Sequence, residues 1–506
     1  MLSAFFAPGP WWPPALSLPA QGFIRLAYGV LLLATLLWAL PHGRRFFLSE
    51  RWGGYAESAA WRDRLHSPAA YPFVMGTWLV CALLLVLDRA VLWAALVNVV
   101  LCRHYFIRLR WKGALRGMGA PGFMTYWLGA AVLLLEAATR LMPSARPIAL
   151  AALQIDLAVI MLSAGTYKVT AGFTQNEGME LGLANPAWGY WWRRYAALPP
   201  SHWLLWTLNQ LAWSTEVTAA ILMLLPPTRT LGGLLLIASF FFIATQIRLA
   251  LLCEMVMTCG VLYFAPGTAP DRLVGAIAAR AGTVHPLGAS AFPALEQPVA
   301  IVLWAYLLLL PLAHAGLFYN LYARRSLPGG WQRVLERYTN VFGMIVWRVF
   351  SADLVNFFIR IYRQDRETGK RVLISRYGLG GGLRFSHVAE SITVTCVFTT
   401  LKYYATNAAL FEQRLRRYVR TLPAAATDVV VLEYVSLLKI PTSFQAVPVA
   451  EYVVDPISGT ISCSVLRPDV SVHAAHVGSP LREGTKPGSY VPLAPAAGGR
   501  SGPATR

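Results

Sequence analysis

Long apolar runs constrain the fold of this chain more than any other feature of its sequence. A helix needs about 20 apolar residues to cross a hydrocarbon core of roughly 30 Å. With 56% hydrophobic and only 13% charged residues, the chain has the composition of a membrane protein. The sequence therefore predicts a polytopic α-helical membrane protein with about nine transmembrane helices. The predicted spans lie near residues 22–41, 70–88, 90–107, 122–142, 147–168, 203–226, 230–247, 249–266 and 298–321.

The pattern changes after residue 325, where the long apolar runs end. DVVVLEYVSLLKI and AEYVVDPISGTISCSV predict strands, the second a hairpin around Pro456 and Gly459. FEQRLRRYVRTL has helical spacing with a basic face. These features divide the chain into an N-terminal segment, a transmembrane domain, a small C-terminal α+β domain, and a Gly/Pro/Ser-rich tail predicted to be disordered. Their predicted bounds are 1–21, 22–325, 326–477 and 478–506.

The strongly basic composition indicates membrane orientation rather than nucleic-acid binding. The formal net charge is +20, but the basic residues lie in short loops between apolar runs, where they orient membrane helices. No basic face separates from these loops, so no nucleic-acid partner is expected. The arginine-rich loops after the first and third runs are predicted to share the cytoplasmic side with Arg193, Arg194, Arg324 and Arg325. The few lysines and many alanines and glycines suggest a multi-pass protein of a bacterial inner membrane.

The cysteines do not indicate a disulfide framework or a metal site. Six are scattered along the chain without a C-x-x-C pair or a His/Cys cluster. We therefore expect no metal, and interpret the cysteines as small buried residues.

Several ionisable residues lie within or at the ends of the apolar runs. A charge at the centre of a bilayer costs a few kcal/mol, so these side chains should face one another or an interior cavity. For any single one, a structural pair or a headgroup anchor is the alternative; several in one bundle favour a polar interior site. They are His104, Glu136, Asp156, Lys168, Glu216, Glu254 and His314.

Three stretches resemble, in their order and spacing, the motifs of the HTTM superfamily, which includes the vitamin K-dependent gamma-glutamyl carboxylases. A-G-T-Y-K, ending at Lys168, with Phe173 and then Glu177-Gly178, resembles the A-G-x-x-K…W…E-G signature. R-H-Y-F, which contains His104, resembles the H-Y-W segment. TEVTAAILMLLPPTRTLG resembles the acidic residue, apolar run and S-R-S-I-G turn of the family, and matches Glu216 to the acidic residue.

The resemblance implies an activity and a cofactor. In the carboxylases, a reduced naphthoquinone reacts with oxygen, and the strong base that results removes a proton from a glutamate side chain before carbon dioxide adds. By this resemblance, Lys168 is the base that deprotonates a vitamin K-like hydroquinone, and His104 donates a hydrogen bond or carries a proton. Glu216, Asp156 or Tyr167 would support or orient them, and the sequence does not choose between these. The substrate would be lipid-soluble or a peptide.

An aromatic segment follows the lysine. AWGYWWRRYAALPPSHWLLW predicts an amphipathic helix lying in the membrane interface, where aromatic rings and arginine stems are both stable. It would cover the site or admit a lipid-like substrate, although a simple interfacial belt is an equal alternative. The candidate substrate- or lipid-binding residues are Trp188, Trp191, Trp192 and Arg193.

Two functions of different classes follow. The first is a carboxylase-like enzyme of lyase or oxygenase type, acting with a reduced quinone or another lipid-soluble substrate through Lys168 and His104. The second is a non-catalytic membrane protein of the HTTM type, in lipid binding, transport or assembly, whose C-terminal domain binds a protein partner that the sequence does not identify. For Lys168 alone, a cation that extends from the end of a span to the lipid headgroups is a further interpretation.

Overall fold

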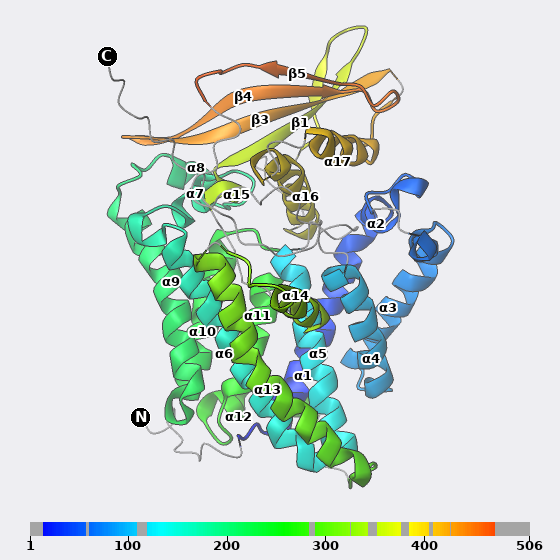
Figure 1. The fold of residues 1–506 in the computed structure, drawn as a ribbon, viewed down its shortest axis with the longest axis vertical. Helices are drawn as coiled ribbons and strands as arrows, with labels where there is room; N and C mark the ends of the chain where they lie inside the picture. The colour runs from blue at the N-terminus through cyan, green and yellow to red at the C-terminus, as the bar shows by residue number, and fades with distance from the viewer. Residues whose placement is uncertain are drawn as a thin grey trace.

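A bundle of helices, covered at one end by a small sheet, makes up the protein (Figure 1). The computed structural model describes residues 14–56, 60–108, 119–282, 289–323, 325–342, 352–375, 384–403, 408–425 and 427–470. The tail predicted over 478–506 and most of the N-terminal segment lie outside the described residues. The class predicted from the sequence, a helical membrane protein followed by a small α+β unit, agrees with this architecture.

Five helical segments are long and apolar enough to cross a membrane, which supports the multi-pass prediction. They are built on α1 (Leu18–Ala39), α5 (Gly119–Leu141), α6 (Arg146–Thr170), α10 (Arg229–Gln246) and α13 (Pro293–Tyr322). The other four predicted spans coincide with α3 (Ala70–Val86), α4 (Val91–Cys102), α9 (Trp203–Leu224) and α11 (Leu252–Gly260). The helices α3, α4 and α11 are short, and polar residues interrupt α9. The number of nine spans therefore stays a prediction.

Shorter elements join the helices and close both ends of the bundle. Toward the sheet lie α2 (Gly43–Phe47), η3 (Glu50–Trp52), α7 (Met179–Ala184) and α8 (Trp192–Ala196), whereas α12 (Ala269–Arg280) lies at the far end (Figure 1). The remaining described elements are η2 (Leu40–His42), η4 (Ala60–His66), η5 (Arg103–Arg108), η7 (Pro143–Ala145), η8 (Phe173–Gln175), η9 (Pro226–Thr228), η10 (Val261–Tyr263), α14 (Trp331–Phe342) and α15 (Ala352–Val355).

The C-terminal unit is an antiparallel sheet with two helices between it and the bundle (Figure 1). Its strand order is β2-β1-β3-β4-β5. β3 coincides with the predicted strand DVVVLEYVSLLKI, β4 and β5 form the predicted hairpin, and α17 contains the predicted basic helix. The elements are β1 (Phe357–Asp365), β2 (Arg371–Leu373), α16 (Arg384–Tyr403), α17 (Ala408–Arg420), β3 (Asp428–Ile440), β4 (Ser443–Val454) and β5 (Ile461–Val465).

Aromatic rings hold the two helices against the sheet. Phe398 of α16 contacts Phe411 of α17, with ring centroids 5.4 Å apart, and also Tyr434 of β3 and Tyr452 of β4. Both phenylalanines are almost fully buried. Such aromatic clusters bury large areas and add specific edge contacts, and this cluster is continuous with the hydrophobic core of the bundle.

Polar contacts fasten the C-terminal unit to the end of the bundle. The Asn185 amide, just after α7, donates hydrogen bonds to the carbonyls of Val355 (2.7 Å) and Phe357 (2.9 Å). Lys439, near the end of β3, forms an ion pair of 2.7 Å with Glu180 of α7. On the other side of the unit, two more ion pairs join it to the segment after α1: Arg45–Glu390 at 2.7 Å and Arg417–Glu50 at 3.1 Å.

The six cysteines form no disulfide. Four are buried, as expected, but Cys396 is half-buried and Cys463 is exposed on the edge strand β5. The expectation of burial was wrong for Cys463 because β5 has only one neighbouring strand.

Candidate functional site

Lys168 and Glu216 meet inside the helical bundle. Lys168 lies in the last turn of α6 and forms an ion pair with Glu216 of α9. The two residues are only 5% and 3% exposed. The interpretation of Lys168 as a cation that reaches the lipid headgroups is therefore wrong: packing against α9 gives the ammonium group a carboxylate partner inside the protein.

The carboxylate of Glu216 is only partly satisfied. Its Oε1 atom contacts Lys168, whereas its Oε2 atom is buried and has no hydrogen-bond partner among the described residues. A buried carboxylate oxygen without a partner is costly, because burial removes the water that would otherwise solvate it. The position is suited to accept a hydrogen bond from a hydroxyl group that enters the bundle.

Gly165 explains why the lysine and the glutamate meet. A Cβ atom on Gly165 would lie 2.6 Å from Val217 Cγ2 and 3.0 Å from the Trp213 carbonyl oxygen, so only glycine permits this approach of α6 to α9. Residues three apart lie on the same face of a helix, and Lys168 follows Gly165 by three. The Ala-Gly step of the motif thus positions the lysine.

The later part of the same motif shapes the turn after α6. Gly172 has φ +97°, a left-handed conformation that ends the helix. Phe173 is fully buried, and a Cβ atom on Gly178 would lie 2.3 Å from its ring. Glu180, which the sequence analysis did not single out, accepts hydrogen bonds from the Gly178 N–H (2.8 Å) and the Asn209 amide (2.8 Å). The motif residues beyond Lys168 therefore organise backbone and packing.

His104 lies in a second polar group and pairs with a histidine that sequence reasoning missed. Its Nε2 atom is 3.2 Å from Nε2 of His66 in η4. The Nδ1 atom of His66 is 2.7 Å from the Phe47 carbonyl, which can only accept, so His66 carries its proton on Nδ1. The neutral His66 ring then accepts at Nε2, and His104 must donate to it. Nothing in the spacing of the two histidines along the chain predicts this contact.

Burial sets the protonation state of His66. The residue is 3% exposed, and desolvation lowers its pKa despite the opposing effects of the Phe47 carbonyl and the nearby Asp63 carboxylate. The neutral imidazole is therefore favoured, in agreement with its role as hydrogen-bond acceptor from His104.

Asp156, expected as a possible partner of Lys168, belongs to a different cluster. Its carboxylate accepts hydrogen bonds from Trp127 Nε1 (2.8 Å) and the Tyr306 hydroxyl (3.1 Å). It precedes Lys168 by twelve residues in α6, roughly 18 Å along the helix axis. Of the two acidic residues that the sequence offered to support Lys168 or His104, Glu216 is the one that pairs with the lysine. Asp156 Oδ1 and the neighbouring His314 Nε2 are buried without a hydrogen-bond partner among the described residues.

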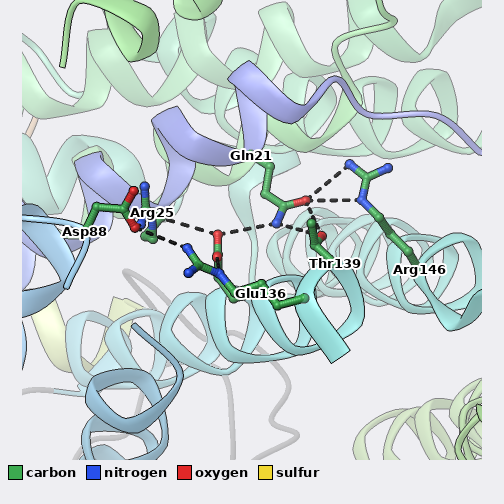
Figure 2. A network of polar contacts seen from close by, with 7 residues as sticks. Gln21, Arg25, Asp88, Glu136, Thr139 and Arg146 are labelled. Carbon is green, nitrogen blue, oxygen red and sulfur yellow. Dashed lines mark hydrogen bonds and ion pairs between the residues drawn. The ribbon is translucent and has the colours of Figure 1, made fainter. Parts of the chain in front are cut away.

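Glu136 takes part in a third polar network, at the end of the bundle away from the sheet. Figure 2 shows it between Arg25 and Gln21 of α1, with Thr139 on one side and Asp88, from the turn between α3 and α4, on the other. Arg25 is 1% exposed and forms an ion pair with Asp88, while Arg140 bonds Glu136 at 2.9 Å. These mutual contacts join α1, α5 and the α3–α4 turn, and indicate a structural role.

The aromatic segment after α7 does not form the long amphipathic helix that was predicted. Only α8, of five residues, is helical before α9 begins at Trp203. A Cβ atom on Gly189 would lie 2.0 Å from the Leu183 carbonyl oxygen, and Arg248 donates to the Gly189 carbonyl at 2.8 Å. These contacts fold the segment back on α7, and the Pro199-Pro200 pair separates α8 from α9.

The candidate binding residues of this segment differ in exposure. Trp188 is buried, like Tyr167 beside the lysine, whereas Trp191 is 48% exposed and donates to the Thr245 carbonyl at 3.1 Å. Trp192 is half-buried, and the exposed Arg193 guanidinium lies 5.5 Å from its ring centroid. The exposed Trp191 and Arg193 side chains suit a membrane interface.

Among the described residues, no group of three or more histidine, cysteine or acidic side chains comes together as a metal site would require. Searches with protein-family models, against curated proteins and against solved structures gave no match to this chain. The resemblance to the HTTM superfamily therefore stays a prediction from the motifs.

Proposed function

We propose that this protein is a membrane-embedded enzyme in which the buried Lys168–Glu216 pair takes up one proton from the hydroxyl group of a lipid-soluble substrate. A reduced quinone is the substrate or cofactor that the motif resemblance indicates. The observation that supports the proposal is the buried Lys168–Glu216 pair with one carboxylate oxygen left without a partner.

The energetics of the pair favour a functional explanation over a purely structural one. Removing two charges from water is costly, and replacing a buried ion pair by apolar side chains is often neutral or stabilising. Leaving Glu216 Oε2 unsatisfied adds about 1–3 kcal/mol to that cost. Ionisable residues within membrane helices commonly mark a substrate or proton pathway.

The proposed roles follow from the donor and acceptor atoms present. Glu216 Oε2 accepts the hydrogen bond of the entering hydroxyl and orients it, and the Lys168–Glu216 pair takes up its proton. The apolar side chains of α6 and α9 exclude water from the reacting group. A reduced quinone, when bound, would supply a two-electron donor with an acidic hydroxyl group. His104 pairs with His66, and the proposal assigns the proton transfer to Lys168 and Glu216.

A second candidate is a non-catalytic role in assembly. It is favoured by the ion pair between Lys439 and Glu180, which fastens the C-terminal unit to the turn that follows α6. In that case the Lys168–Glu216 pair would serve to hold α6 against α9 beneath the attached unit.

The two candidates are separated by variants that remove one or both charges of the pair. The assay is hydroquinone-dependent oxygen uptake by the protein in nanodiscs, with mass spectrometry for quinone epoxide. Lys168→Met leaves a carboxylate buried alone and should destabilise the fold by about 3–5 kcal/mol, whereas Lys168→Met with Glu216→Gln removes both charges and should recover stability. Lys370→Met, at an exposed position of the C-terminal unit, is the matched control.

An enzyme loses turnover in both variants, including the double variant that remains folded, and keeps it in the control. Oxygen uptake that persists in the folded double variant would reject the enzymatic proposal and favour the assembly role. The same conclusion would follow if wild-type protein showed neither uptake nor epoxide with any naphthoquinol or benzoquinol.

A further inference from the structure

A pocket lies where the segment after α1 meets the C-terminal unit. It has a volume of about 400 Å³ and lies between the η3 turn and helix α17. Figure 1 shows α17 beside the sheet and α2, which leads into η3, across from it. The lining residues are Glu50, Arg51, Gly53, Gly54, Gln413, Arg416, Arg417 and Arg420.

The pocket concentrates positive charge from two separate parts of the chain. Arg416, Arg417 and Arg420 follow Gln413 by three, four and seven residues, so all four occupy one face of α17. Arg51 comes from the opposite wall, where the left-handed Gly53 (φ +77°) completes the η3 turn. Among the described residues that line the pocket, four are arginines and one, Glu50, carries a carboxylate.

The arginines are only partly neutralised by the protein. Glu50 pairs with Arg417 at 3.1 Å, and Arg416 bonds Glu412 at 2.7 Å and the Gly459 carbonyl. Arg420 is exposed and forms no ion pair with another described residue, and Arg51 is 69% exposed, 3.9 Å from Asp63.

The helix dipole explains only some of the arginines that line this pocket. Basic side chains in the last turn of a helix interact favourably with the helix dipole, which explains arginines at the end of α17. The helix dipole does not explain why Arg51 of η3 approaches the same pocket from the opposite wall, nor why the pocket remains open. Like charges that converge on a pocket repel one another, and an anion bound between them in addition to Glu50 would relieve that repulsion.

We propose that this pocket binds a phosphate-bearing anion, held by the guanidinium groups of Arg51, Arg416 and Arg420. Guanidinium groups bind phosphate oxygens through paired, charge-assisted hydrogen bonds. The volume falls within the range of about 300–1,000 Å³ that is usual for small-molecule sites, and exceeds the needs of a bare phosphate ion. The same chemistry is offered by an anionic phospholipid headgroup at the membrane surface and by a soluble phosphorylated compound. This site is independent of Lys168 and Glu216.

Binding of two probes distinguishes the sources. Phosphatidylglycerol is titrated into the detergent-purified full chain and followed by native mass spectrometry, and pyrophosphate is titrated separately and followed by calorimetry. Saturable binding of phosphatidylglycerol alone identifies a lipid headgroup, whereas binding of pyrophosphate identifies a soluble ligand. The proposal is rejected if neither probe binds.

Variants locate the bound probe. Arg420→Gln should weaken binding about tenfold, because one charge-assisted contact is removed, and Arg51→Gln should do the same from the other wall. Arg420 forms no ion pair with another described residue, so its variant should fold normally. Arg467→Gln, at an exposed arginine after β5, is the control and should bind as wild type. Equal binding by the pocket variants and the control would also reject the proposal, because the probe would then lie elsewhere.

Discussion

Gly165 of α6 lies so close to Val217 of α9 that a single added methyl group would be 2.6 Å from the valine Cγ2 atom. One residue before Val217 is Glu216, and three residues after Gly165 is Lys168. The close approach of the two helices is therefore what allows a lysine and a glutamate, far apart in the sequence, to form a buried pair.

Gly165→Ala should separate the helices and destabilise the protein by about 1–3 kcal/mol, the usual cost of overpacking. The Trp213 carbonyl oxygen, 3.0 Å from the added atom, belongs to the backbone and cannot move away as a side chain would. Thermal unfolding in detergent measures the effect. Gly76→Ala in α3 is the control, because no atom lies within 4 Å of its added Cβ, and it should leave stability unchanged or slightly higher. Equal unfolding midpoints in the two variants would contradict this account of the contact.

The His66–His104 contact should depend on pH. Burial lowers the pKa of His66, so the fold accepts its neutral form. The stabilising effect is present above the unfolded value of about 6.5 and is lost as the pH falls below it, when His66 can no longer accept from His104. Unfolding midpoints measured between pH 8 and pH 5 should decline in wild type and change less in His66→Phe. Parallel pH profiles for the two proteins would show that this histidine does not cause the decline.

Much of the fold could be predicted from the sequence because hydrophobic periodicity is a local signal. The strand β3, the β4–β5 hairpin and the helix α17 all lie where alternation or helical spacing placed them. The aromatic segment was mispredicted because its conformation depends on distant contacts. Arg248, 59 residues further along the chain, donates a hydrogen bond to the Gly189 carbonyl, and no local pattern in the segment carries that information.

The candidate site was predicted only in part for the same reason. Lys168 and Glu216 were both identified as ionisable residues in apolar runs, but the choice between Glu216 and Asp156 as the partner of Lys168 depends on helix packing. His66 was missed because it lies in a short polar segment between two runs, where a histidine is unremarkable. Contacts between segments, rather than residue types, are what the sequence leaves undetermined here.

Asp156→Leu should be more harmful than Asp156→Asn. Leucine leaves the buried Trp127 indole N–H without its acceptor, at about 1–3 kcal/mol, and removes the hydrogen bond that the half-buried Tyr306 hydroxyl donates to Asp156. Asparagine keeps one acceptor oxygen and should lose less. Chemical or thermal unfolding in detergent compares the two variants, and a leucine variant as stable as the asparagine variant would mean that these hydrogen bonds contribute little.

The attachment of the C-terminal unit should weaken at acidic pH. Burial opposes ionisation of Glu390, but the Arg45 guanidinium and the Tyr418 hydroxyl outweigh this effect and hold its pKa below the ordinary value. A depressed pKa contributes stability above the unfolded value of about 4.3, and that contribution is lost as the pH falls from there through the folded value. Limited proteolysis with an acid-active protease should therefore release the unit more readily below pH 4. In Arg45→Met, cleavage should already be faster at neutral pH, and identical cleavage of variant and wild type at every pH would argue against this role of the pair.

Lys439→Met should loosen the other side of the same attachment. Glu180 is fully buried, and without the lysine its carboxylate keeps only the Gly178 N–H and the Asn209 amide as the donors described here. Loss of this partly buried contact should weaken attachment by about 1–3 kcal/mol. Hydrogen exchange should then increase in β3 and in the turn after α6 together, because the pair joins them, while Lys370→Met changes neither segment. Faster exchange in β3 alone would mean that the turn is held independently, and that the C-terminal unit does not stabilise the end of α6 where Lys168 lies.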